Sequence, residues 1–330
     1  MPKVCYGIKS LKNIIKQQKP SAVCFVTTKF VFKKNKHVLK NVWDDKFKVC
    51  FIPDGEKAKD WSEIEKLLKK WKKFNLDRKS LIIALGGGTV GDSVGFTSSI
   101  YMRGVPYIQV PTTLLSQVDS AHGGKTGINF MNYKNLVGSV YPALVTIIES
   151  EFLQTLLSEQ IIDGLGEIIK AGFINDSKII TLLKKENVFT ILKSTKLQEI
   201  IRRTIDVKNL YVSKDLMDVG IRQMLNFGHT VGHAVELKYK ISHGKAVIIG
   251  MLHELFIMEK LGLNSPDVRK ELVSLLDSLR IKIDREYRPD WKSLLSDKKI
   301  QGEVIILPVI EKVGKSNLLN VNLDDLKKLV

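Results

Sequence analysis

The stretch LIIALGGGTVGD, residues 81–92, joins an apolar run to a glycine-rich turn and decides the fold class. The run LIIAL is typical of a buried strand, and Gly86, Gly87 and Gly88 follow it at once, with a helical pattern soon afterwards. Glycines between a strand and a helix let backbone N–H groups approach a phosphate, and the helix N-terminus adds a favourable dipole. Because the spacing is not GxGxxG, the segment taken alone is equally compatible with a tight structural turn.

Short β-branched runs flank this stretch and alternate with helical patterns. Residues 60–74 place apolar side chains at helical spacing between two such runs. The predicted strands besides 81–85 are residues 22–28, 48–53, 107–111 and 145–149. Strands that alternate with helices are typical of an α/β domain with a largely parallel sheet.

The pattern changes near residue 150, beyond which β-rich runs nearly vanish. Long helical patterns cover residues 196–211 and 244–261, and only residues 304–308 resemble a strand. The sequence contains no internal repeat and no low-complexity linker. We therefore predict an α/β domain over residues 1–150 and a mostly α-helical domain over residues 151–330, with ligands bound in a cleft between them.

Composition excludes several classes of protein. The chain of 330 residues is 44% hydrophobic, which is enough to bury the cores of two ordinary domains. Its longest apolar stretches end well short of the about 20 residues that span a membrane. The amino terminus is interrupted by lysines every few residues, unlike a signal peptide, so we expect a cytoplasmic protein. Cys5, Cys24 and Cys50 lack CxxC spacing and are interpreted as small core residues.

The net charge of +17 raises the alternatives of a nucleic-acid partner, an acidic surface or an anionic substrate. The lysines are scattered, however, and no aromatic residues alternate with them as in a nucleic-acid module. We expect a solvated, lysine-rich surface that helps to attract phosphorylated substrates, and neither nucleic acid nor a membrane as partner.

The segment YIQVPTTLLSQVD, residues 107–119, is a second unit in which a strand runs into a turn. Thr112 and Thr113 place their hydroxyls where they either cap a helix or bind a ligand. The residues alone leave both interpretations open.

Charged residues interrupt an apolar helical pattern in DGLGEIIKAG, residues 163–172. Glu167 and Lys170 are three positions apart, so their side chains project in the same direction. A surface ion pair is one interpretation. The surrounding isoleucines and leucines favour a buried helix, in which charges are costly unless they are paired or bind a metal.

Histidines cluster in the second half, with four of the six between residues 229 and 253. In NFGHTVGHAVE, residues 226–236, His229 and His233 are four apart on a helical pattern, so they can reach one metal or one substrate. With His243 and a buried Glu167, this cluster predicts a metal site. Histidine and carboxylate ligands with an open position suit Zn²⁺ acting as a Lewis acid on a hydroxyl or carbonyl.

An ordered series of motifs between about residue 50 and residue 300 resembles the 3-dehydroquinate synthase family. The motifs are DGEKAK (54–59), GGGTVGD (86–92), YMRG (101–104), PTTLLSQVDS (111–120), GGKTGIN (123–129), KNLVG (134–138), GLGEIIK (164–170), GIRQMLNFGHTVGHAVE (220–236), HGKAV (243–247) and DKK (297–299).

The resemblance implies a Rossmann-like N-terminal domain, a helical C-terminal domain, NAD and a divalent metal, Zn²⁺ or Co²⁺, near the cleft, and a homodimer. The NAD contacts that it implies are Asp54, Glu56, Lys57, Gly87, Gly88, Asp92, Thr112, Thr113, Asp119, Lys125, Lys134, Phe152 and Thr155. Carboxylates fit ribose hydroxyls, whereas the glycine turn and the threonines fit the pyrophosphate.

The metal ligands implied by the resemblance are Glu167, His229 and His243, with His233 directed to the substrate instead of the metal. The implied catalytic and substrate-binding residues are Arg103, Lys125, Asn135, Lys170, Lys208, Arg222, Asn226 and His233, with one lysine of 298–299. Most of these side chains are cations or amides, as a substrate with a carboxylate and a phosphate requires.

The implied reaction converts 3-deoxy-D-arabino-heptulosonate 7-phosphate to 3-dehydroquinate and phosphate, by transient oxidation, phosphate elimination, reduction and intramolecular aldol closure. Two alternatives are a sister cyclase, such as 2-deoxy-scyllo-inosose synthase, and a metal-dependent alcohol or glycerol dehydrogenase. Three positions depart from the family pattern: Gly166 stands for the usual alanine, Asp218 for the usual glutamate, and His122 for a small or apolar residue.

Overall fold

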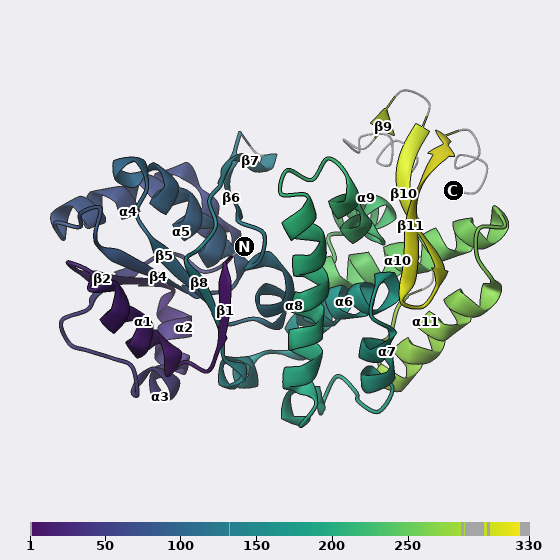
Figure 1. Ribbon diagram of the computed structural model, residues 1–330, viewed down its shortest axis with the longest axis horizontal. Helices are drawn as coiled ribbons and strands as arrows, with labels where there is room; N and C mark the ends of the chain where they lie inside the picture. Colours follow the sequence, from purple (N-terminus) through teal and green to yellow (C-terminus); the bar gives the residue numbers. More distant parts are fainter. Residues whose placement is uncertain (1, 132, 285–286, 288–299, 302–303, 324–330) are drawn as a thin grey trace. The chain divides into compact units, whose positions relative to one another are not determined.

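The computed structural model divides the chain into two compact units, Met1–Leu156 and Leu157–Val330. It describes residues 2–131, 133–284, 287, 300–301 and 304–323 (Figure 1). Each unit is built on its own pattern of elements, a parallel sheet in the first and a set of helices in the second.

The first unit contains the predicted α/β fold. Its six strands pair in parallel in the order β1-β8-β5-β4-β2-β3. The strands are β1 (Lys3–Tyr6), β2 (Val23–Thr27), β3 (Lys48–Phe51), β4 (Leu81–Gly86), β5 (Tyr107–Pro111) and β8 (Val145–Ile148). The helices are α1 (Ser10–Gln18), α2 (Lys29–Lys34), α3 (Lys36–Leu39), α4 (Trp61–Lys73) and α5 (Gly88–Ile100), with shorter turns η1 (Gly55–Lys59), η2 (Tyr101–Arg103), η3 (Ser116–Ser120) and η4 (Ser150–Thr155).

Strand β4 is apolar throughout because helices cover both faces of the sheet. Leu81, Ile83 and Leu85 belong to one core cluster, which α1 and α3 help to form, whereas Ile82 and Ala84 belong to another with α4 and α5. The two groups of helices lie on opposite sides of the strands in Figure 1. This layering is that of a Rossmann-like sheet.

The glycine turn lies where the strand order reverses. The chain runs from β2 outward to β3, and then returns to β4 on the other side of β2. In open α/β sheets, ligands bind at the carboxyl ends of the strands at such a switch point. Gly87 and Gly88, between β4 and α5, occupy this position.

A two-stranded antiparallel hairpin, β6 (Lys125–Phe130) and β7 (Tyr133–Val140), extends the first unit and was not among the predicted strands. Its strands carry glycines, lysines and asparagines in place of a continuous apolar run, and β7 is mostly exposed. Sequence periodicity therefore gave little signal for it.

The second unit is mostly helical, as predicted. Its helices are α6 (Ser158–Ile174), α7 (Ser177–Leu183), α8 (Leu197–Lys214), α9 (His229–Tyr239), α10 (His243–Lys260) and α11 (Pro266–Leu279), with η5 (Ile191–Lys193) and η6 (Ile221–Asn226) between them. None of the helices within the described ranges is both long and apolar enough to cross a membrane.

The strand predicted at residues 304–308 is present, but the expectation that it is the only strand of the second half was wrong. Strand β10 (Val304–Lys312) is longer and pairs antiparallel with both β9 (Ile300–Gln301) and β11 (Lys315–Asn322). The sequence of β11, KSNLLNVN, is rich in polar residues and its side chains are largely exposed, so it did not resemble a strand.

Candidate functional site

Glu167 and Lys170 lie one turn apart on α6, and both side chains are buried, with 2% and 3% of their surface exposed. They form the ion pair that their spacing predicted. Burial alone would raise the pKa of Glu167, but the charge of Lys170 and the contact with His229 outweigh it and hold this pKa well below its usual range. Glu167 is therefore an ionised carboxylate in the core of the unit.

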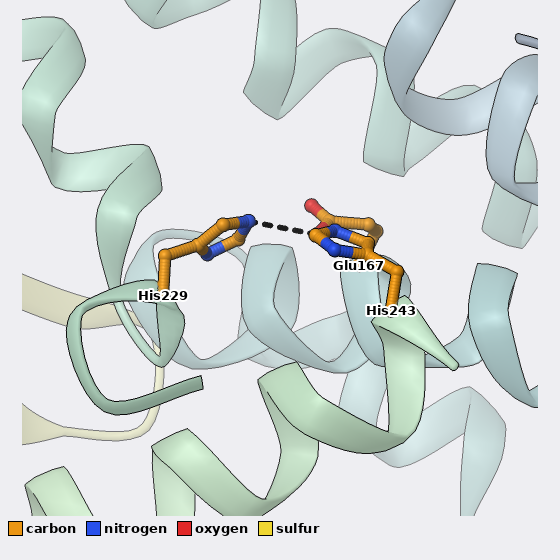
Figure 2. A group of neighbouring side chains, drawn as sticks. All are labelled: Glu167, His229 and His243. Atoms are coloured by element: carbon orange, nitrogen blue, oxygen red, sulfur yellow. Dashed lines mark ion pairs between the residues drawn. The ribbon is translucent and has the colours of Figure 1, made fainter. Parts of the chain in front are cut away.

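His229 and His243 bring their imidazoles to this carboxylate (Figure 2). The Nε2 atoms lie 3.3 Å and 3.4 Å from Glu167 Oε1, and one ligand atom from each of the three residues lies within 4.8 Å of the others. His229 is the first residue of α9 and His243 the first residue of α10. Three separate helices thus supply one ligand each.

The Nδ1 atoms of both histidines form hydrogen bonds with protein acceptors, which leaves Nε2 for a metal. His229 Nδ1 donates to the carbonyl of Phe227 at 3.2 Å, and His243 Nδ1 donates to Glu236 Oε2 at 3.1 Å. Such outer partners fix the tautomer and the ring orientation of metal-binding histidines.

The protonation of the two imidazoles differs in the metal-free chain. Burial, together with the charge of Lys170, lowers the pKa of His229 to about 3. Burial would also lower the pKa of His243, but its hydrogen bonds to Glu167 and Glu236 outweigh burial and raise the value to about 10.

The donor set fits a divalent metal. Two imidazole nitrogens and one carboxylate oxygen are the ligands of catalytic Zn²⁺ sites, which keep a further position open, and Co²⁺ takes similar ligands. His233 lies beside this group but is not one of its three members, with its ring centroid 5.3 Å from that of His229 and 6.3 Å from that of His243. Its side chain is exposed, consistent with a role toward substrate.

Close helix packing brings the ligands together. A Cβ on Gly166 would lie 2.8 Å from the carbonyl oxygen of Gly244, and a Cβ on Gly244 would lie 2.2 Å from Asp163 Cα. Asp163 Oδ1 also accepts the Gly244 N–H at 2.9 Å, at the start of α10. The glycine at position 166, a departure from the family pattern, therefore lets α6 touch the residue next to His243.

We expect Glu236→Gln to weaken metal binding by about 10- to 100-fold, because an amide replaces the carboxylate that accepts from His243 Nδ1. Equilibrium titration with Zn²⁺ against a competing chelator measures the change. The exposed residue Glu159, which pairs with Lys245 near the start of α10, provides the control: Glu159→Gln should bind the metal as the parent chain does. Equal affinity of the Glu236 variant would show that the negative charge of Glu236 does not support the site.

In the first unit, the two strand-to-turn segments meet. A Cβ on Gly87 would lie 3.2 Å from Thr113 Cγ2, and a Cβ on Gly88 would lie 3.0 Å from Ser120 Oγ. Thr113 Oγ1 accepts the Ser116 N–H at 3.2 Å, so this hydroxyl caps the turn that begins η3. The two turns form one surface of backbone and small side chains, to which a pyrophosphate can come close.

A buried lysine that sequence reasoning missed lies next to this surface. Lys59 Nζ donates to Asp92 Oδ2 at 2.6 Å and to Asn135 Oδ1 at 2.7 Å. Lys57, the lysine expected to contact NAD, is exposed. The sequence offered one weak signal for this lysine: Lys59 follows the apolar residue Ala58, and both residues are buried in η1.

The remaining predicted cofactor residues differ in exposure. Thr112 is buried and Asp119 half-buried, and Glu56 accepts from Asn129 Nδ2 at 2.8 Å. Phe152 is fully buried in the core under the sheet. The exposed ones are Asp54, Glu56, Lys125, Lys134 and Thr155.

The predicted substrate residues outside the ligand cluster lie in both units. Arg103 is exposed in the first unit. In the second, Lys208 and Asn226 are half-buried, and the buried Arg222 donates from NH1 to the Leu216 carbonyl at 2.8 Å. Asp218 adopts a left-handed backbone with φ of 63°. Lys298 and Lys299 lie outside the described residues.

Three acidic residues that accept hydrogen bonds from His243 or from the backbone beside a ligand were also missed: Asp163, Glu236 and Glu254. Glu236 was detectable, since it follows His233 by three positions and so lies on the same side of α9. Glu254 was also detectable, because a glutamate stands there among the apolar residues of α10.

Family models match most of the chain. The model of the 3-dehydroquinate synthase N-terminal region matches residues 49–163, and that of the C-terminal region matches residues 164–300. A 3-dehydroquinate synthase from Dictyoglomus turgidum is 38% identical over 322 residues, which cover 95% of this chain and 90% of that protein.

Solved structures show the same fold. A 2-epi-5-epi-valiolone synthase from Streptomyces hygroscopicus subsp. jinggangensis, with NAD⁺ and Zn²⁺ bound, superposes with a TM-score of 0.87 at 24% identity, covering 100% of this chain and 95% of that one. A 2-deoxy-scyllo-inosose synthase in complex with carbaglucose-6-phosphate, NAD⁺ and Co²⁺ gives 0.86 at 23% identity, covering 99% and 95%. The two matching regions and the identity to curated relatives decide the family: the chain belongs to the 3-dehydroquinate synthase family.

Proposed function

We propose that this chain converts 3-deoxy-D-arabino-heptulosonate 7-phosphate to 3-dehydroquinate and inorganic phosphate, with NAD and a divalent metal, Zn²⁺ or Co²⁺. The observation that carries the proposal is the buried cluster of Glu167, His229 and His243, in a chain that the family models match from residue 49 to residue 300. The reaction belongs to the shikimate pathway of aromatic amino acid biosynthesis.

The ligand cluster defines what the second unit does. Glu167, His229 and His243 hold the metal, which when bound supplies Lewis acidity to a substrate hydroxyl or carbonyl. Lys170, buried beside Glu167, keeps a fixed positive charge next to the oxygen atoms that react. His233, adjacent and exposed, is suited to move a proton because the pKa of an ordinary imidazole is near neutrality.

Cations are available for the anionic groups of the substrate. Arg222 uses one guanidinium N–H for the Leu216 carbonyl, and a guanidinium has further donors for a carboxylate. We assign Lys125, Arg103 and Lys208 to the same anionic substrate, and NAD to the surface formed by the glycine turn, Thr112, Thr113 and Asp92. A phosphorylated small molecule as partner, a homodimer and a cytoplasmic location complete the proposal and rest on the family resemblance.

A sister cyclase acting on another sugar phosphate is the second candidate, because the fold is shared with such enzymes. A substrate without a carboxylate would leave a buried cation, Arg222, without an anionic partner among the residues that the structure describes. A dehydrogenase that releases NADH is less well supported, since it has no need of several lysines directed at phosphate.

The decisive experiment incubates metal-loaded protein with catalytic NAD⁺ and 3-deoxy-D-arabino-heptulosonate 7-phosphate. Phosphate release is followed, and the organic product is identified by mass and NMR. We expect dehydroquinate without net NADH, and loss of activity when a chelator removes the metal, with recovery on addition of Zn²⁺ or Co²⁺. Metal and NAD⁺ binding without phosphate release would contradict the assignment and favour the sugar phosphates of the sister cyclases. Stoichiometric NADH would favour the dehydrogenase.

A further inference from the structure

Glu254 is a carboxylate buried inside α10, with 2% of its surface exposed. Its neighbours along the helix include the buried residues Met251, Leu255 and Met258. Burying a carboxylate costs several kcal/mol unless hydrogen bonds or charges compensate. The proposed reaction assigns no role to this residue, so its position requires a physical reason.

The carboxylate binds the first turn of α9. Glu254 Oε2 accepts the Gly228 N–H at 2.7 Å, and Oε1 accepts the Val231 N–H at 3.2 Å. These N–H groups lie at the start of a helix, where the helix supplies no acceptor and the dipole favours a negative charge. Gly228 has a left-handed φ of 77° and immediately precedes His229. Glu254 therefore caps α9 on both sides of a metal ligand.

The same side of α10 carries the other histidine. Glu254 follows His243 by eleven residues, which at about 3.6 residues per turn is three turns, so the two side chains leave α10 in nearly the same direction. Between them, Val247 and Gly250 pack on α9: a Cβ on Gly250 would lie 1.9 Å from Gly228 O, and a Cβ on Gly228 would lie 2.7 Å from Val247 O. One face of α10 thus contacts the start of α9.

We propose that Glu254 is a positioning residue of the metal site. By binding Gly228 and Val231, it fixes the first turn of α9 against α10, and so sets the distance between His229 and His243. It touches neither of the two imidazoles in the contacts described above, and acts through the backbone that carries His229. The inference rests on the proposed metal site.

The test measures metal binding directly, without turnover. Glu254→Gln keeps the shape of the side chain but replaces one of the two carboxylate oxygens with an NH2 group. Only one of the two backbone N–H groups then finds an acceptor. Glu254→Leu removes both acceptors and suits the apolar surroundings, so it provides a second variant if the first does not fold. Glu159→Gln, which changes an exposed glutamate of α6 that pairs with Lys245 of α10, is the matched control. Far-UV circular dichroism checks that each variant is folded.

We expect the affinity for Zn²⁺ and Co²⁺ to fall by about 10- to 100-fold in either Glu254 variant. The visible spectrum of bound Co²⁺ should shift in position and intensity, because the two imidazoles no longer meet the ion at the original geometry. The control should match the parent chain in both measurements. NAD⁺ affinity is a further readout that a misfolded sample would lose.

The outcomes distinguish the positioning role of Glu254 from the existence of the metal site. A folded Glu254 variant with the parental metal affinity and Co²⁺ spectrum would overturn the positioning role, even if its thermal stability were lower. A parent chain that binds neither ion, or binds them equally well after His243→Ala, would instead remove the metal site itself and with it the proposed function.

Discussion

The variant Glu167→Gln will lose its bound metal and about 3–5 kcal/mol of its free energy of unfolding, because it leaves a buried cation without its partner. Lys170 is nearly inaccessible to water and forms an ion pair with Glu167. The amide of glutamine is also a poor metal ligand. Urea unfolding measures the stability, a chelator titration measures the metal, and we expect dehydroquinate formation to fall by at least about 1,000-fold, or about 4 kcal/mol of transition-state stabilisation.

A double variant separates the two effects. Glu167→Gln combined with Lys170→Met removes both charges and places an apolar chain of similar length among the buried residues of α6. Replacing a buried ion pair in this way is often neutral for stability. We expect most of the lost stability to return, while metal binding and activity stay absent. A single variant as stable as the parent would show that Lys170 reaches solvent or another anion.

Gly244→Ala will disrupt the metal site although it adds only one methyl group. Helix propensity alone favours alanine by about 1 kcal/mol. The new Cβ, however, would lie 2.2 Å from Asp163 Cα and 2.6 Å from Asp163 O, and neither backbone atom can rotate away. The start of α10 must therefore shift and carry His243 with it. We expect metal affinity and kcat/KM to fall by at least about 100-fold, as misplacement by about 1 Å can do.

Gly172→Ala in α6 is the matched control for this steric effect. Its Cβ would lie 2.4 Å from Cδ1 of Ile180, the end of a side chain that can change rotamer. Metal affinity should stay within about threefold of the parent. If Gly244→Ala also kept its affinity, the contact between α6 and α10 would be more compliant than the packing implies.

The sequence predicted those parts of the fold in which one physical signal dominates. A continuous apolar run followed by glycines identified β4 and its turn, since a strand covered on both faces has no polar alternation. Strands β7 and β11 were missed because their side chains are largely exposed, and β6 because its short sequence KTGINF carries no continuous apolar run. These segments form strands because they pair with a neighbouring strand, and the sequence of a single segment does not show that pairing.

The ligand cluster was predictable for a different reason. Glu167 stands out because a charge on an apolar helix is costly, and histidines are rare enough in this chain for their clustering to be informative. Asp163, which accepts the Gly244 N–H, resembles an ordinary surface acid in the sequence, and Glu236 is marked only by its spacing from His233. Their roles depend on which helix N-terminus or imidazole lies opposite, and that is fixed only by the packing of α6, α9 and α10.

Helices α9 and α10 approach closely enough for their backbones to touch, beside the side-chain contacts of Val231, Val235 and Ile249. Gly250 faces the carbonyl of Gly228, and a Cβ on Gly232 would lie 2.9 Å from the carbonyl of Ala246. In protein engineering, the two helices therefore have to be transferred together as one unit. A graft of His229 and His243 onto another helical pair would not reproduce their spacing unless these glycines were transferred with them. In directed evolution, the seam between the two helices offers almost no acceptable alternatives.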